Sequence, residues 1–329
     1  AQYAPLLKPP ESENNRLRGR LFSRYASMLS IAWAPLYAHP LPAGHRFPML
    51  KYELLPEQLL REGVVPASAF FHPEPPPAAD ILRAHDASYY HRLLHGQLTR
   101  AEERATGFPW SLQLVEREVT ILGGTLECAR RALRHGVALN VAGGTHHAFR
   151  DRGEGFCLLN DQAAAAHYLL NYPELGVRRV LIVDLDVHQG NGTAAIFRHE
   201  PRVFTFSMHG ARNYPHRKEQ SDLDLALPDG TDDATYLRLL RETLPRLLDQ
   251  HQSDFVFYLS GVDVLATDKL GHLSLTPQGC RIRDEYVLRL CHQHRLPVVV
   301  CMGGGYSPRL ADILDAHANT FRAAAELWG

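Results

Sequence analysis

Four separate apolar runs of this 329-residue chain are each followed at once by polar residues flanked by glycine. The runs are rich in β-branched residues and are typical of strands. In a parallel sheet, ligands bind beyond the carboxyl ends of the strands, so we expect the four segments to meet at one site. Their sequences are Gly143-Gly144-Thr145-His146-His147, Asp184-Leu185-Asp186-Val187-His188-Gln189-Gly190-Asn191, Ser260-Gly261-Val262-Asp263 and Gly303-Gly304-Gly305-Tyr306.

The remaining sequence alternates between strand-like runs and longer amphipathic segments. This alternation predicts an α/β fold with three layers, in which helices flank a central, mostly parallel β-sheet. No linker divides residues 25–329, so we predict a single domain there, preceded by a loosely ordered arm over residues 1–24. The expected strands are Ile31–Tyr37, Val137–Val141, Arg179–Val187, Val203–Met208, Phe255–Ser260 and Pro297–Met302, and the expected helices span residues 79–95, 111–134, 161–171, 233–251 and 277–294.

Charge and cysteine content exclude several classes of protein. Lysine and arginine number 35 against 36 aspartates and glutamates, so bulk charge does not draw the chain to nucleic acid. The five cysteines are scattered without CxxC spacing, which argues against disulfides and favours the reducing cytoplasm. The least charged stretch, Tyr25–Gly44, is interrupted by serines and prolines. We therefore expect a buried first strand there rather than a signal peptide, and no membrane partner.

Asp184, Asp186 and His188 alternate along one predicted strand, which would place all three on the same face. Two carboxylates and an imidazole are costly to bury together unless a cation compensates them. Asp263, at a neighbouring strand end, completes a set of oxygen and nitrogen donors suited to zinc or another transition metal. The alternative is a buried network of ion pairs, which a lone Asp-x-Asp would favour.

Two further segments add groups capable of acid–base chemistry. His146 and His147 could be metal ligands, or acid–base groups beside a water that a metal activates. Asp184 and Asn191 are the candidates to hold their other ring nitrogens. Tyr306, after three glycines, can donate a hydrogen bond to a developing oxyanion. The alternative in each case is an ordinary loop residue packed on its neighbours.

Together these motifs resemble the zinc-dependent histone deacetylase superfamily, over most of the chain from about Ile31 to Tyr306. Gly155-Phe156-Cys157 matches a further family motif, and the segments His45–Tyr52 and Asp268–Leu275 resemble its bacterial and class IV members. The resemblance implies the arginase-deacetylase fold and a deacetylase catalytic domain over residues 25–329. It also implies one zinc ion per chain and a structural potassium ion.

The resemblance assigns roles by position in this sequence. Zinc would be held by Asp186, His188 and Asp263. The catalytic residues would be His146, His147 and Tyr306, with Asp184 holding His146 and Asn191 facing His147. The substrate-binding site would be lined by Phe156, Tyr214, Gly155 and Gly304. Potassium would be bound at Asp184, Asp186, His188, Ser207 and Met208, and a second cation at Phe197, Glu200 and Val203.

The sequence departs from the family pattern at two places. Some branches have an aspartate where this chain has Asn191, and an amide orients His147 without stabilising its charged form. We therefore expect His147 to be less basic here. Many members also carry an acidic residue at the rim of the acyl-lysine tunnel, and residues 106–110 offer none. An aromatic rim could serve a small amide or a longer acyl chain equally well.

We predict a zinc-dependent amidohydrolase that removes acyl groups, above all acetyl, from the Nε-amine of lysine in proteins or peptides. The alternative on the same site is a hydrolase of acylpolyamines or of long-chain acyl-lysine. A binuclear manganese ureohydrolase would need bridging carboxylates where this chain has Gly190 and Leu265. A zinc-binding protein that recognises acylated ligands without hydrolysing them is a further alternative. The sequence does not indicate an oligomeric state.

Overall fold

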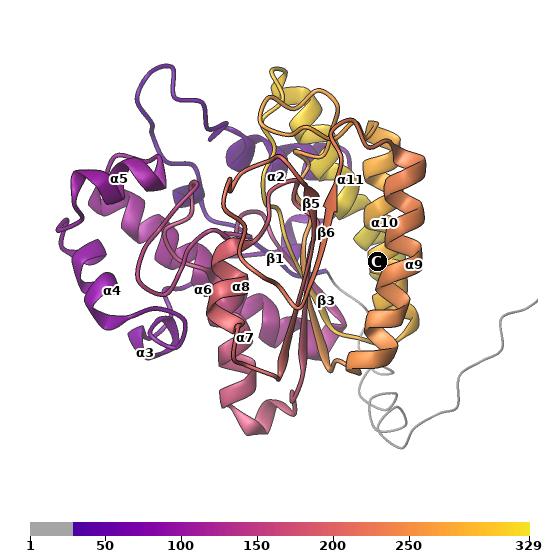
Figure 1. The fold of residues 1–329 in the computed structure, drawn as a ribbon, viewed down its shortest axis with the longest axis horizontal. Coiled ribbons are helices and arrows are strands. Elements are labelled where there is room, and N and C mark those ends of the chain that lie inside the picture. The colour runs from indigo at the N-terminus through magenta and orange to yellow at the C-terminus, as the bar shows by residue number, and fades with distance from the viewer. Residues whose placement is uncertain (1–28) are drawn as a thin grey trace, which may run out of the picture.

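A computed structural model describes residues 29–329, in which one parallel β-sheet lies between two layers of helices (Figure 1). The predicted arm, residues 1–24, lies outside the described residues. The predicted α/β fold is confirmed, and every strand pair in the described part is parallel. In spatial order the strands are β2 (Phe70–Phe71), β1 (Ile31–Ala32), β3 (Val137–Asn140), β8 (Val298–Cys301), β7 (Phe255–Leu259), β4 (Val180–Asp184), β5 (Val203–Gly210) and β6 (Leu223–Leu227).

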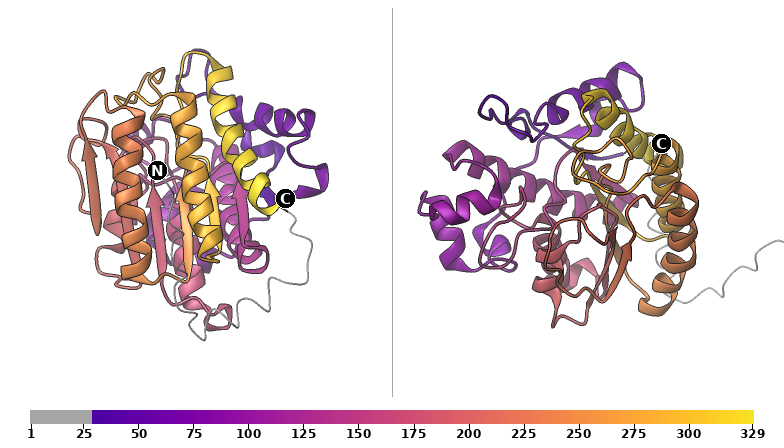
Figure 2. Two further views of the ribbon diagram at one scale, coloured as in Figure 1. Left: turned by 90° about the vertical axis from the view of Figure 1, so that its right-hand side faces the viewer. Right: turned by 45° about the horizontal axis from the view of Figure 1, so that its top comes forward.

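Helices cover both faces of the sheet. Three long helices stand in a row on one face (Figure 2): α9 (Asp233–His251), α10 (Pro277–Gln293) and α11 (Leu310–Trp328). The opposite face is covered by α6 (Leu112–His135), α7 (Asp161–Asn171) and α8 (Asn191–Phe197). The remaining helices are α2 (Lys51–Arg61), which packs on α11, and α3 (Ala78–Ile81), α4 (Ala87–Leu94) and α5 (Arg100–Thr106). Within residues 29–329 no helix combines the length and apolarity needed to cross a membrane.

Local chemistry explains where the principal elements form. The central strands β4 and β7 read VLIVD and FVFYL and are buried at every position, as strands covered on both faces must be. Helix α6 begins where the Ser111 hydroxyl accepts the N–H of Leu114, and it ends at Gly136 in the left-handed region with φ of 87°. Thr276 caps α10 in the same way, with Pro277 at its first position.

Several predicted boundaries were wrong. The strand predicted over Ile31–Tyr37 is only two residues long, because Pro35 begins a 3₁₀ turn. The strand predicted over Arg179–Val187 ends at Asp184, where polar loop chemistry replaces the apolar run. The helix predicted over residues 79–95 is divided into α3 and α4 by a turn. The short strand β2, the edge strand β6 and the helices α2, α5, α8 and α11 were not predicted.

The register of the central strands aligns the ends that carry the polar segments. Asp184 of β4 pairs with Leu259 of β7, and Leu259 pairs with Cys301 of β8. Cys301 in turn pairs with Asn140 of β3. Four adjacent strands therefore end at one level, and the loops that follow them converge at one edge of the sheet.

Candidate active site

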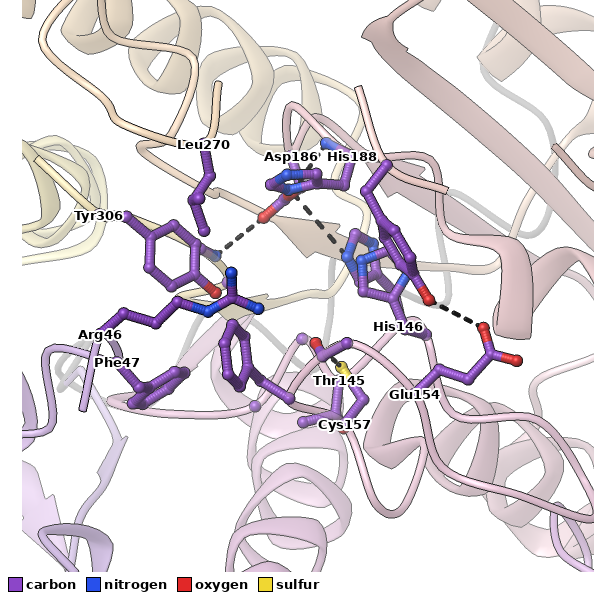
Figure 3. A pocket seen from close by; sticks show the side chains of 18 of the residues that line it. Arg46, Phe47, Thr145, His146, Glu154, Cys157, Asp186, His188, Leu270 and Tyr306 are labelled. Carbon is purple, nitrogen blue, oxygen red and sulfur yellow. Dashed lines mark hydrogen bonds and ion pairs between the residues drawn. The ribbon is translucent and has the colours of Figure 1, made fainter. Parts of the chain in front are cut away.

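Residues of three of the four polar segments line one pocket of about 460 Å³ at this edge of the sheet (Figure 3). Its lining includes the side chains predicted to act on substrate and much of the predicted metal site. Asp263 lies beneath the surface and Asn191 behind His147, so neither is part of the lining. The predicted residues that do line the pocket are His146, His147, Gly155, Phe156, Asp186, His188, Tyr214, Gly304 and Tyr306.

Asp186, His188 and Asp263 form the one group of potential metal-ligating side chains found within residues 29–329, and their ligand atoms all lie within 4.8 Å of one another. His188 Nδ1 is 3.0 Å from Asp186 Oδ1 and 3.2 Å from Asp263 Oδ2. Asp263 Oδ2 is buried with no hydrogen-bond partner among the described residues. Burial and the charge of Asp186 raise the pKa of Asp263. The raised pKa reflects the cost of burying the charged carboxylate, and a bound cation would remove that cost. The donor set fits zinc.

The loop after β4, rather than a strand, orients these ligands. The prediction that Asp184, Asp186 and His188 share a strand face was therefore wrong in its geometry. The Asp186 N–H donates to Asp184 Oδ1 (3.2 Å), and the His188 N–H donates to Asp186 Oδ1 (2.9 Å). The Val187 N–H donates to Asp263 Oδ1 at 2.9 Å, which ties this loop to the one after β7.

Each of the tandem histidines has one ring nitrogen held by a buried partner. His146 Nδ1 lies 2.7 Å from Asp184 Oδ2, and His147 Nδ1 lies 2.6 Å from Asn191 Oδ1. Burial lowers the pKa of His146, but the carboxylates of Asp184 and Asp186 outweigh it and raise this pKa overall. Burial, together with the charges of the other histidines, holds the pKa of His147 well below its usual value. His147 is therefore neutral at neutral pH and able to accept a proton.

Tyr306 lies across the pocket from His146, with its hydroxyl directed toward the centre (Figure 3). Its backbone N–H donates to Asp268 Oδ2 at 2.6 Å, which anchors the end of the glycine run. Burial, followed by the charges of Asp263 and Asp186, raises the pKa of Tyr306 well above its ordinary value. The hydroxyl therefore stays protonated and can donate a hydrogen bond.

Two glycines allow the backbone to approach the reactive side chains. A Cβ on Gly155 would lie 2.7 Å from the His147 ring and 3.1 Å from the Tyr214 ring. Gly304, predicted to contact substrate, packs on the metal group: its N–H donates to Asp186 Oδ2 at 2.8 Å, and a Cβ there would overlap the Asp263 carboxylate. Any side chain at either position would displace catalytic geometry.

The aromatic wall is built from Phe156 and Tyr214. Phe156 has φ of 67°, and its N–H donates to the Thr106 carbonyl at 2.8 Å. The Tyr214 ring stands edge-on to His147, with centroids 4.9 Å apart, and its hydroxyl donates to Glu154 Oε2 at 2.9 Å. Both rings therefore border the space that the reacting group would occupy.

The residues predicted to bind potassium lie around the β4–β5 pair. Asp184 and Ser207 are cross-strand partners, and Met208 follows Ser207 on β5 with its side chain fully buried. Of the residues predicted for the second cation, Phe197 ends α8 and Val203 begins β5. Their potassium and cation roles remain predictions.

Sequence reasoning missed several residues that hold the site. Arg283 on α10 is completely buried and donates to the carbonyl oxygens of Leu185 (3.1 Å), Ser260 (3.3 Å) and Gly261 (2.7 Å). These carbonyls belong to the two loops that carry the metal group, so one guanidinium joins both loops. A fully buried position for this arginine could not be read from its helix, which carries further arginines.

Lys51 and Glu154 were also missed as supporting residues. Lys51 is fully buried and donates to the Gly303 carbonyl at 3.0 Å, and burial lowers its pKa to about 8. Glu154 Oε2 lies 3.4 Å from the Asn191 amide nitrogen, which fixes the amide with its oxygen toward His147. Lys51 stands in the segment His45–Tyr52 and Glu154 directly precedes the Gly155-Phe156-Cys157 motif, but the contacts of both residues depend on the fold.

Comparison with known proteins gives consistent results. The family model "Histone deacetylase domain" matches residues 45–321. An uncharacterised protein of Picosynechococcus is 44% identical over 299 residues, which is 91% of this chain and 99% of that protein. Histone deacetylase 2 of Arabidopsis thaliana is 31% identical over 279 residues, covering 82% of this chain and 72% of that protein. Among solved structures, the HDA15 HD domain has a similar fold, with a TM-score of 0.73 at 20% identity over 88% of this chain and 89% of that one.

Proposed function

Because this chain belongs to the histone deacetylase family, we propose that it hydrolyses the amide bond of Nε-acyl-lysine, above all acetyl-lysine, in proteins or peptides. Family membership makes the chain a hydrolytic deacetylase; the lysine substrate and the residue roles are our proposal. The observation that carries it is the convergence of a three-residue metal group, a base-competent histidine and a tyrosine hydroxyl on one pocket. The 44% sequence identity between this chain and the Picosynechococcus protein supports a place among the bacterial members of the family.

Asp186, His188 and Asp263 would hold the zinc ion on which the family depends. Bound there, zinc would polarise the scissile carbonyl and lower the pKa of the attacking water. The Asp263 Oδ2 atom makes no hydrogen bond with a described residue, and all three ligand side chains are buried, which supports this assignment. The Gly304 N–H holds the Asp186 carboxylate, and Arg283 joins the two loops that carry the ligands.

His147 is the proposed general base. Its Nδ1–H donates to Asn191, which leaves the Nε2 lone pair free to take a proton from water. His146, with its pKa raised by Asp184, is suited to remain protonated and to support the charge that builds up next to it. Together the two imidazoles return a proton to the departing lysine amine, so that acetate and a free amine are formed.

Tyr306 is the proposed oxyanion donor. Its hydroxyl stays protonated and faces the centre of the pocket, so it can stabilise the charge that develops on the carbonyl oxygen. Phe156 and Tyr214 would pack on the aliphatic stem of the acyl-lysine. These two rings would bind the substrate and orient its amide bond for the reaction.

We further propose a potassium ion near Asp184 and Ser207, supported by their pairing across β4 and β5. Thermal stability measured in KCl and in a chloride of a larger organic cation tests it, and equal stabilities would contradict it. A cytoplasmic location also stays a prediction, in keeping with five buried, free cysteines.

The experiment that tests the function is a substrate panel that crosses acyl length with amine carrier. Zinc-loaded protein is assayed with acetyl, butyryl and myristoyl groups on lysine peptides and on a polyamine, with Tyr306→Phe as the inactive control. We expect the highest kcat/KM for acetyl-lysine peptide. A preference for the acylpolyamine or for the myristoyl peptide would replace the proposal by the alternative on the same site.

A further inference from the structure

Two arginines at the mouth of the pocket have no role in the proposed reaction. Arg46 and Arg104 both line the pocket and both are exposed. Neither guanidinium makes a hydrogen bond or ion pair with another residue of the described range 29–329. The inference drawn from them rests on the proposed function, because it concerns which acyl-lysine the same site prefers.

Arg46 is held at the mouth by the residues on either side of it. His45 Nε2 donates to the Gly107 carbonyl at 2.9 Å, and the buried Phe47 ring packs on the rings of Phe156 and Tyr306. The Arg46 guanidinium lies 5.0 Å from the centroid of the Phe156 ring, in cation–π contact with the pocket wall (Figure 3). Its charge is therefore presented to whatever enters the pocket.

Arg104 is placed against the same wall by the end of α5. The Ala105 carbonyl accepts the N–H of Gly155 at 2.9 Å, and the Thr106 carbonyl accepts the N–H of Phe156 at 2.8 Å. These bonds fix the last turn of α5 to the segment that carries the Phe156 ring. Both arginines thus belong to elements that are tied directly to Phe156.

Among the described residues that line the pocket, no acidic side chain is free to neutralise these charges. Glu154 is the acidic side chain nearest the surface in the lining, and it already accepts hydrogen bonds from Arg152 at 2.8 Å and Tyr214 at 2.9 Å. An acidic rim residue would accept from the substrate's backbone N–H groups. A guanidinium only donates, and its fork fits a carboxylate best.

We propose that the pocket prefers acyl-lysine that carries a carboxylate beside it, which Arg46 and Arg104 bind at the mouth. When the acyl-lysine side chain occupies the pocket, the backbone of that lysine lies at the mouth. The Cα atom of the next residue is then only about 3.8 Å from the Cα atom of the lysine. Two sources of the carboxylate satisfy this chemistry. One is an aspartate or glutamate next to the acyl-lysine, and the other is the free C-terminus of a peptide that ends on it.

The test compares kcat/KM for acetyl-lysine peptides that differ only in one flanking residue: Glu, Gln or Lys. A second pair ends on acetyl-lysine, with either a free or an amidated carboxyl group. We expect the carboxylate peptides to exceed their neutral partners by about 5–10-fold, an advantage that shrinks as salt is raised. An advantage in the flanking-residue peptides identifies an acidic side chain as the source of the carboxylate, and an advantage in the second pair identifies the free C-terminus. Equal values for acidic and neutral peptides in both pairs would overturn the inference.

Variants assign the preference to the two arginines. Arg46→Gln and Arg104→Gln should each reduce the acidic-to-neutral ratio, and Arg46→Glu should bring it below one. Arg134→Gln, which removes an exposed arginine at the far end of α6, is the matched control and should keep the ratio. Because each ratio is taken within one variant, a general loss of activity cancels. A ratio that survives both Gln substitutions and the Glu substitution would contradict the assignment.

The proposed function and this inference fail in different ways. If no acetyl-lysine peptide releases acetate while another acylamine is hydrolysed, the proposed function is wrong. Peptide Kd values measured on the Tyr306→Phe variant still decide the inference in that case, because they need no turnover. Acidic and neutral peptides with the same Kd, or none that bind, would overturn it.

Discussion

Replacing Asn191 with Asp adds a charge beside His147 and is expected to move the pH–rate profile upward. His147 Nδ1 lies 2.6 Å from Asn191 Oδ1, and burial with the nearby histidines holds the His147 pKa well below its usual value. A carboxylate at this distance favours the imidazolium and raises a histidine pKa by about 1–3 units. The base acts only when deprotonated, so a higher pKa shifts the acid limb of kcat/KM to higher pH by about the same amount.

Glu154 modulates the expected shift. The Asn191 amide nitrogen lies 3.4 Å from Glu154 Oε2, so an aspartate at 191 would face a second carboxylate there. Adding Glu154→Gln replaces that repulsion by a donor. The double variant should therefore recover activity that Asn191→Asp loses and keep an upward shift.

The assay is kcat/KM for an acetyl-lysine peptide between about pH 5 and 10, on zinc-loaded wild type, Asn191→Asp and the double variant. Asn171→Asp, the same charge change at an exposed position on α7, is the matched control and should leave the acid limb in place. An acid limb of Asn191→Asp that is unchanged or moved to lower pH, with zinc content and Tm as in wild type, would refute the assignment of His147 as base.

Three further predictions test Tyr306, Gly304 and Arg283. Tyr306→Phe should lower kcat by about 10²–10³-fold with a smaller change in KM, and near-wild-type turnover would remove Tyr306 from the mechanism. Gly304→Ala should weaken zinc binding about 10–100-fold in chelator competition, because the new Cβ would overlap Asp263 and lie 2.9 Å from Asp186 Oδ2; unchanged affinity would show that the loop adapts. Arg283→Met should lower the free energy of unfolding in urea by about 3–5 kcal/mol, because it leaves the adjacent buried carboxylate unpaired, and a loss below about 1 kcal/mol would contradict this.

Much of the fold and site could be predicted because the signals are local. Apolar runs such as Phe255–Ser260 identify buried strands without knowledge of their neighbours. The polar segments that follow them identify the edge where chemistry gathers, since parallel strands end together. The Pro35 turn and the short β2 strand were misjudged because a short strand next to proline gives no clear periodicity.

The supporting contacts of the site could not be predicted in the same way. Arg283 is 98 residues from Leu185, and Lys51 is 252 residues from Gly303. Residues this far apart leave no mark on local periodicity. Arg46 stood inside a recognised motif, but its position over the Phe156 ring depends on how two distant loops pack.

The sequence by itself determined the alternation of the central strands with the principal helices, the edge of the sheet that carries the site and the donor types available there. Only the tertiary structure decided that Asp186, His188 and Asp263 meet within 4.8 Å, that Asn191 is oriented by Glu154, and that one buried arginine joins two loops. The physical reason is that strand and helix patterns follow from neighbours along the chain. The distances that make a set of donors into a metal group are set by strand register and loop packing between segments far apart in sequence.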